Sequence, residues 1–174
     1  LFEDVTEYVR LERRLAETTD YLNLLIESLN DGFYAMNAEG RFSFCNQAFL
    51  DMLGLRSGEE LFRKGPFDIV MPEEAPKIER MLERRRRGEK VFFETLLMRS
   101  DGGALPVQIS SAPLFRSGEF AGIVGIAHDL SERRRLEAMV EQSHKYLERA
   151  YEELSVLDKM KSDFIAIASH ELRT

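Results

Sequence analysis

A single cysteine, no tryptophan and only five prolines occur in the 174 residues of the chain. One thiol cannot close a disulfide within the chain, and no Cys and His residues have the spacing of a zinc site. The longest apolar stretches, residues 121–127 and 164–168, are far shorter than the roughly 20 residues that span a bilayer. The sequence therefore predicts no metal site and no transmembrane segment. Because it begins at Leu1 without an initiator Met or a signal peptide, we expect a piece of a larger protein.

Positive charge is also scarce, since 24 basic residues stand against 31 acidic ones and the net charge is −7. This balance argues against a general nucleic-acid binder. The one basic run, Arg84–Arg87, lies among Glu79, Glu83 and Glu89. We interpret it as a solvated helix end, where cations suit the helix dipole. The alternative, a nucleic-acid contact, is disfavoured by the acidic total.

Apolar residues recur at alternating steps of three and four over residues 1–30 and again from residue 131 onward. This is the spacing of the a and d positions of a coiled coil, although the first segment could also be an amphipathic helix packed on its own domain. The second helix has no domain of its own to cover it, so we expect a homodimer to bury both stripes. The expected interface residues are Leu11, Leu15, Leu22, Leu25, Leu136, Val140, Leu147, Leu154 and Leu157.

Residues 31–130 have a different character, with Gly, Pro and short apolar runs whose period approaches two. Asn46 is expected to cap a short helix that ends at Gly54, and a longer helix is expected to run from Pro72 to Arg87. The element order predicts an α+β domain with a five-stranded antiparallel sheet and helices on one face. The expected strands are 32–37, 41–45, 91–99, 105–110 and 120–128.

Two short segments resemble one another, Asp4–Glu7 and Asp129–Glu132, and each leads into a helix. We interpret residues 1–7 as the end of an upstream copy of the same module.

No Gly or Pro separates the last strand from the second helix, so the joint is expected to be stiff. Asp129 is expected to bind backbone or basic groups at the start of the helix, and Ser131 is expected to cap that helix. These two residues are therefore candidates for relaying a signal from the sheet to the helix.

The chain ends in Ser-His-Glu-Leu-Arg-Thr, residues 169–174. His170 lies off the apolar stripe, so its imidazole would face water on a dimeric helix, beside Glu171 as a proton acceptor. This hexapeptide resembles the phosphoacceptor box of the sensor histidine kinases of two-component systems. The resemblance implies that His170 accepts the γ-phosphoryl group of ATP, that Glu171 orients it and takes its proton, and that Thr174 positions water for dephosphorylation of a partner.

Residues 31–130 resemble a PAS sensor domain in their opening Gly-Phe, in the segment 44–54, in the Asp-Gly-Gly turn at 101–103 and in the passage from 122 to Asp129. The resemblance implies a sensing domain and leaves its ligand open. No His lies in residues 72–87 to hold haem, and Cys45 is not in the Asn-Cys-Arg motif of flavin photoreceptors, so we interpret it as a small buried apolar residue. The 12 Phe and 7 Met residues could line an apolar pocket or fill the core.

These features predict a helical linker at 1–30, a PAS sensor domain at 31–130, a signalling helix at 131–160 and the start of a truncated phosphoacceptor helix at 161–174. The whole protein is expected to be a histidine kinase that uses ATP and Mg²⁺ and acts on a response regulator in the cytoplasm; whether it is anchored to a membrane is left open by this sequence. This stretch lacks an ATP-binding domain, so we expect it to hold no cofactor of its own and to be inactive alone. The alternative is a non-catalytic PAS ligand- or cofactor-binding dimerisation module of another signalling protein.

Overall fold

The structure is a computed structural model that describes the backbone of residues 2–171 and the side chains of residues 9–165, 167 and 168. The chain divides into two units between Ser131 and Glu132. The first contains the sheet, and the second is helical.

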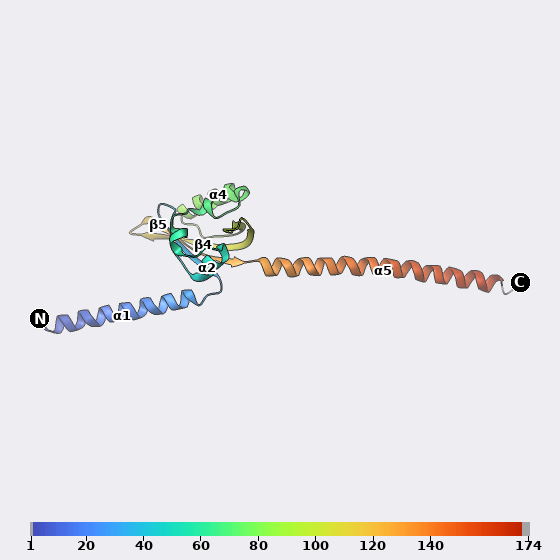
Figure 1. Cartoon of the computed structure of the whole chain (residues 1–174), viewed down its shortest axis with the longest axis horizontal. Coiled ribbons are helices and arrows are strands. Elements are labelled where there is room, and N and C mark those ends of the chain that lie inside the picture. The colour runs from blue at the N-terminus through green and yellow to red at the C-terminus, as the bar shows by residue number, and fades with distance from the viewer. Residues whose placement is uncertain (1, 172–174) are drawn as a thin grey trace. The chain divides into compact units, whose positions relative to one another are not determined.

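The first unit is built on a five-stranded antiparallel sheet with the strand order β2-β1-β5-β4-β3 (Figure 1). The first and the last strand of the domain in sequence, β1 and β5, are neighbours in the middle of the sheet. They pair from Gly32 opposite Ala127 to Asn37 opposite Gly122. The predicted α+β fold with this sheet is thus confirmed. The strands are β1 Gly32–Asn37, β2 Phe42–Cys45, β3 Val91–Met98, β4 Ala104–Arg116 and β5 Glu119–Asp129.

Four α-helices and two short 3₁₀ helices belong to this unit or lead into the sheet, and α2 contacts β1 while α4 contacts β3 and β4 (Figure 1). Alternate strand residues, such as Met36 and Val107, join helix residues such as Leu53 in one apolar core. The helices are α1 Phe2–Glu27, α2 Gln47–Leu53, α3 Gly58–Phe62, η1 Pro66–Asp68, η2 Pro72–Glu74 and α4 Ala75–Arg86.

The helix expected from Pro72 to Arg87 is split, with a 3₁₀ turn at Pro72–Glu74 before α4 begins at Ala75. The cause is Pro76, which has no N–H to bond the carbonyl of Pro72 four residues earlier. The backbone N–H of Ala75 bonds that carbonyl instead, in the tighter 3₁₀ pattern.

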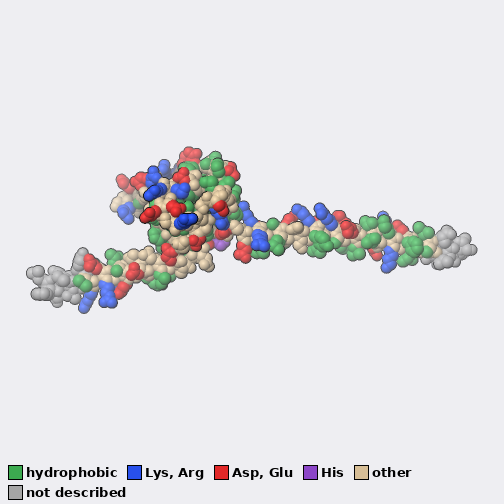
Figure 2. Space-filling view, viewed as in Figure 1, with side chains coloured by type: hydrophobic (Ala, Val, Ile, Leu, Met, Phe, Trp, Pro, Cys, Tyr) green, Lys and Arg blue, Asp and Glu red, His purple; other side chains and the backbone are tan. Residues whose placement is uncertain are grey.

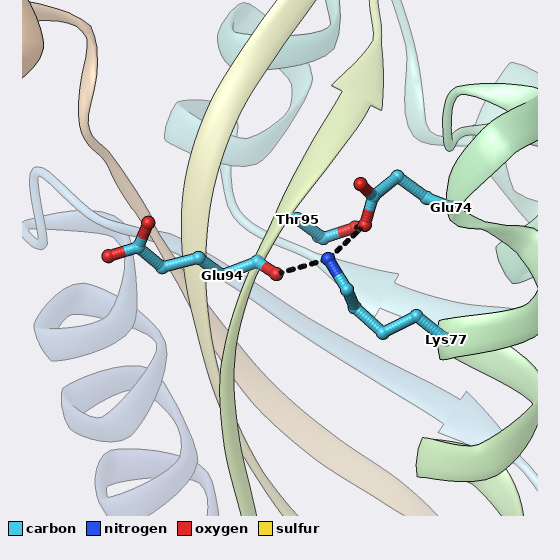
Figure 3. A network of polar contacts seen from close by, with 4 residues as sticks. All are labelled: Glu74, Lys77, Glu94 and Thr95. Atoms are coloured by element: carbon cyan, nitrogen blue, oxygen red, sulfur yellow. Dashed lines mark hydrogen bonds and ion pairs between the residues drawn. The ribbon is translucent and has the colours of Figure 1, made fainter.

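A polar network fixes this turn to the sheet (Figure 3). Lys77 Nζ contacts Glu74 Oε2 and donates to the backbone carbonyl of Glu94 at 3.0 Å. Thr95 Oγ1 donates to the same carboxylate at 2.8 Å. Burial acts to raise the pKa of Glu74, but the hydrogen bonds from Lys77 and Thr95 outweigh it and lower that pKa.

The second unit begins at Glu132, the second residue of helix α5. This helix, Ser131–Glu171, continues for 41 residues without interruption. Its apolar side chains, seen as green patches along the helix in Figure 2, lie open to solvent, as Leu147 and Leu154 do at 62% exposure each. Within the described residues, neither this helix nor any other is both long and apolar enough to cross a membrane.

Candidate functional site

The interior of the sheet-containing unit is almost filled by its own side chains. A cavity of about 30 Å³ lies among residues of β1, β2, β3, β4, α2, α4 and the segment 66–70. This is room for about one water. The Phe and Met residues therefore mainly fill the core: Met36, Phe42 and Phe49 are each less than 5% exposed. The residues that line the cavity are Tyr34, Met36, Phe42, Phe49, Pro66, Ile69, Val70, Ile78, Arg85, Phe93, Thr95, Leu97 and Ile109.

Arg85 is the charged residue of this lining, and it corrects the interpretation of the basic run as a solvated helix end. Its side chain is buried, with 3% of the residue exposed, while Arg84, Arg86 and Arg87 are exposed. Arg85 Nε donates to Ser111 Oγ at 2.8 Å, and the guanidinium carbon lies 5.6 Å from the centre of the Phe93 ring. Burial lowers the pKa of Arg85, and the nearby Tyr34 opposes this shift.

Tyr34 completes this cluster from β1. The strand register places Tyr34, Gly125 and Ser111 side by side on β1, β5 and β4. A Cβ at Gly125 would collide with the Tyr34 phenol, so a glycine is required for that ring to lie across β5. Burial raises the pKa of Tyr34, whereas Arg85 and a hydrogen bond with Ser111 act to lower it. Side chains from β1, β3, β4 and α4 thus meet in this cluster, and Gly125 of β5 leaves room for them.

Asn46 connects the end of α1 to the domain. Its Oδ1 accepts hydrogen bonds from the backbone of Phe33 (2.8 Å) and of Phe49 (3.1 Å), the second being the predicted helix cap. Its Nδ2 donates to the carbonyls of Ile26 and Asp31, both at 3.0 Å. The residue is completely buried and uses all four bonds that its amide can form.

The C-terminal end of the domain, where β5 passes into α5, is also held by defined hydrogen bonds. Asp129 Oδ1 accepts from the backbone N–H of Ser131 at 2.7 Å. Leu130 is buried, and its N–H donates to the carbonyl of Pro106 at 2.9 Å. The side chain that accepts a hydrogen bond from the start of α5 is therefore that of Asp129. Ser131 is itself the first residue of the helix.

Both ends of the domain lie near one another on the first unit. His128 Nδ1, one residue before Asp129, lies 2.7 Å from Asp31 Oδ1, just before β1. A shallow groove of about 530 Å³ is lined by Glu27 at the end of α1 and by Asp129.

Cys45 is half-buried and packs against the core rather than lying fully within it. Burial, and to a smaller extent the charge of Glu27, raise the pKa of its thiol, which disfavours the reactive thiolate. The described side chains contain no group of three or more His, Cys, Asp or Glu residues that could hold a metal ion.

The expected phosphoacceptor residues lie at the end of α5. The helix backbone includes His170 and Glu171, but their side chains lie outside the described residues, as does Thr174 altogether. Their roles remain predictions. The expected interface residues are all exposed apolar side chains, from 44% at Leu25 to 70% at Val140: Leu11, Leu15, Leu22, Leu25, Leu136, Val140, Leu147, Leu154 and Leu157.

Comparison with protein-family models matches residues 26–135 to the PAS fold. Among solved structures, the PAS domain of HTR-like protein from Haloarcula marismortui is similar, with a TM-score of 0.59 and 27% identity, over 69% of this chain and 98% of that one.

Two curated relatives are sensor proteins. The aerobic respiration control sensor protein ArcB of Escherichia coli is 28% identical over 160 aligned positions, which cover 91% of this chain and 19% of ArcB. Sensor histidine kinase TmoS of Ectopseudomonas mendocina is 29% identical over 154 positions, which cover 83% of this chain and 16% of TmoS. The chain therefore spans less than a fifth of the length of either relative.

Proposed function

The chain belongs to the PAS-fold family, and on this premise we propose that it is the sensing and dimerisation section of a two-component sensor histidine kinase. In this proposal, the PAS domain controls the ATP-dependent phosphorylation of His170 and the later transfer of the phosphoryl group to a response regulator. The observation that carries the proposal is the continuity of α5, whose helical backbone runs from Ser131, directly after the PAS sheet, through His170. The similarity to TmoS, which is named as a sensor histidine kinase, supports it.

A parallel homodimer is the second part of the proposal. The exposed stripe of α5 contains Leu136, Val140, Leu147, Leu154 and Leu157 at a and d positions, and such a stripe is stable in water only when another surface covers it. A second copy of the same helix supplies a matching stripe in the same register. Pairing would also bring two copies of His170 to the same end of the coiled coil.

The relay between domain and helix depends on the joint at Asp129. Because Leu130 is buried in the domain and Asp129 holds the N–H of Ser131, a tilt of β5 is transmitted to the first turn of α5. Ser143 and Lys161, at d and a positions, are weak core residues. They leave the packing of the two helices closely balanced between arrangements, as a two-state relay requires.

The chemistry follows from the resemblance of residues 169–174 to a phosphoacceptor box. An imidazole nitrogen of His170 attacks the γ-phosphorus of ATP, ADP leaves, and Glu171 takes the imidazole proton. The kinase ATP-binding domain, which supplies ATP and Mg²⁺, lies in another part of the protein in this proposal. Because the reaction consumes ATP, we place the chain in the cytoplasm.

The test is to incubate the full-length protein that contains this chain with γ-labelled ATP and to map the label by mass spectrometry. We expect an acid-labile phosphoryl group on His170 and its loss in the His170→Gln variant. His144→Gln is a matched control, because His144 is an exposed histidine of the same helix that pairs with Glu148 at 3.4 Å. Label that persists in His170→Gln would refute His170 as the acceptor, and an unlabelled protein would favour a non-catalytic PAS module.

A further inference from the structure

We propose that the projecting end of the β4–β5 hairpin and the neighbouring end of α4 bind the surface of an anionic lipid bilayer. Binding of this kind needs neither ATP nor His170, so this proposal and the proposed histidine kinase can fail separately. The hairpin surface, as defined here, consists of Arg86, Arg87, Lys90, Leu114, Phe115 and Arg116.

The first argument is shape, because the hairpin projects beyond its neighbours in the sheet. Strand β3 pairs with β4 only as far as Ser111, and β1 pairs with β5 only as far as Gly122. Hairpin residues 115–120 pair only with one another. A projecting end of this kind suits a bilayer, which can adapt to a convex surface, better than a small ligand, which requires a concave pocket.

The second argument is the pair of apolar side chains at this end. Leu114 is 43% exposed and Phe115 is 50% exposed. The Phe115 ring packs edge-to-face on Phe120 at 6.1 Å, and a Cβ at Gly88, just after α4, would lie 3.9 Å from it. These contacts hold the ring half-open to solvent. Leucine and phenylalanine in such a position can enter the boundary between lipid headgroups and acyl chains.

The third argument is charge. Because Gly88 lies against the hairpin, the cations at the end of α4 gather beside it. The four cations of the hairpin surface are exposed, and none makes an ion pair with another described residue, whereas Arg84 pairs with Glu89 at 2.7 Å. Glu119, opposite Arg116, is one negative charge against these four. Anionic lipid attracts each cation, while charges elsewhere on this acidic chain are screened beyond about 8 Å.

A nucleic acid or an acidic protein segment could also meet these cations, but neither uses the apolar pair as fully. Base stacking needs a free aromatic face, whereas Phe115 is held between Phe120 and Gly88, and Leu114 has no ring. An acidic segment does not require Leu114 and Phe115 to enter an apolar medium. The remaining explanation is purely structural, a solvated helix end beside a hairpin, and it predicts no binding to lipid.

The test is co-sedimentation of the complete chain with vesicles made of equal parts of phosphatidylcholine and phosphatidylserine. We expect binding that weakens as sodium chloride is added, and none to phosphatidylcholine alone. The double change Arg86→Gln and Arg87→Gln should weaken binding about twentyfold, since each cation near the surface contributes roughly fivefold.

The matched control is the double change Arg56→Gln and Arg63→Gln, which removes the same charge. These exposed arginines flank α3, which contacts β2, the edge strand opposite β3. The control should bind the vesicles as the unchanged chain does. An equal loss of binding in both double variants would show that only net charge matters, and would refute the hairpin surface.

A second measurement uses the lack of tryptophan in this chain, because Phe115→Trp introduces a single fluorescent reporter. We expect its emission to shift to the blue on the anionic vesicles and to be quenched by brominated lipids. Unchanged emission, no sedimentation, or equal sedimentation with phosphatidylcholine alone would overturn the proposal. So would a shift with poly-glutamate or single-stranded DNA but not with vesicles, which would assign the surface to a protein or a nucleic acid. Should Phe115→Trp fail to fold, the two double variants decide the question.

Discussion

Replacing Asn46 should loosen both the PAS core and the attachment of α1 to it. Asn46→Ala removes four hydrogen bonds at a completely buried position and leaves two N–H groups and two carbonyls without that partner. Loss of the helix cap costs about 1 kcal/mol, and each of the other bonds about 1 kcal/mol. We therefore expect a loss of roughly 3–5 kcal/mol, which is a large part of the 5–15 kcal/mol that is typical of a domain.

The isosteric change Asn46→Asp separates the two roles of this residue. Aspartate caps a helix as well as asparagine does, so a capping role alone predicts an almost neutral change. The structure predicts otherwise, because a carboxylate cannot donate to the carbonyls of Ile26 and Asp31 and would place negative charge against them. We expect Asn46→Asp to lose about 2 kcal/mol or more.

Urea denaturation followed by circular dichroism measures these free energies of unfolding, and hydrogen exchange of residues 26–33 reports the loosened α1 end. Asn23→Ala, on the exposed surface of α1, is the control and should change stability by about 0.5 kcal/mol or less. If Asn46→Asp unfolds at the same urea concentration as the unchanged chain, the connecting role assigned to Asn46 is wrong.

Three further predictions concern the interface, the relay and the pH dependence. The double change Leu147→Lys and Leu154→Lys should give monomers in analytical ultracentrifugation, whereas Ala138→Lys, away from the a and d positions, should leave the dimer intact; a dimer in both would exclude this stripe as the interface. Asp129→Ala should alter the ratio of kinase to phosphatase activity of the full-length protein without unfolding it, because only the bond to Ser131 is removed; unchanged activities would refute the relay. Since the pKa of Glu74 is lowered on folding, its ionised form stabilises the fold above the unfolded pKa of about 4.5, and this contribution is lost as the pH falls through the folded pKa. Stability measured against pH should therefore fall less steeply below about pH 4.5 in Glu74→Gln than in the unchanged chain, and equal slopes would contradict the assignment.

Local patterns in the sequence were enough to predict the sheet and most helices. The cap at Asn46 and the helix end at Gly54 depend on residues within one or two turns, and both predictions are confirmed by the structure. The wider role of Asn46 could not be predicted in this way, because its carbonyl partners Ile26 and Asp31 lie 20 and 15 residues away.

The burial of Arg85 shows a different limit. Composition alone makes four consecutive arginines look solvated, but their side chains point in four directions around the helix. Ile78, seven residues before Arg85, is buried on the same face, so the helical period contained a signal for the inward-facing residue. Its partner Ser111 comes from β4, and this pairing required the folded sheet. The roles of His170, Glu171 and Thr174 stay predictions because they depend on side chains beyond those described.

The central claim is that α5 transmits the state of the PAS domain to His170 as a phased coiled-coil helix. The most direct test is to insert residues after Ser143 in the full-length protein and to measure the phosphorylation of His170. Four extra residues shift the apolar stripe out of phase, whereas seven preserve it. We predict that the four-residue insertion disturbs regulated phosphorylation and that the seven-residue insertion largely restores it. Equal effects of the two insertions would contradict the claim.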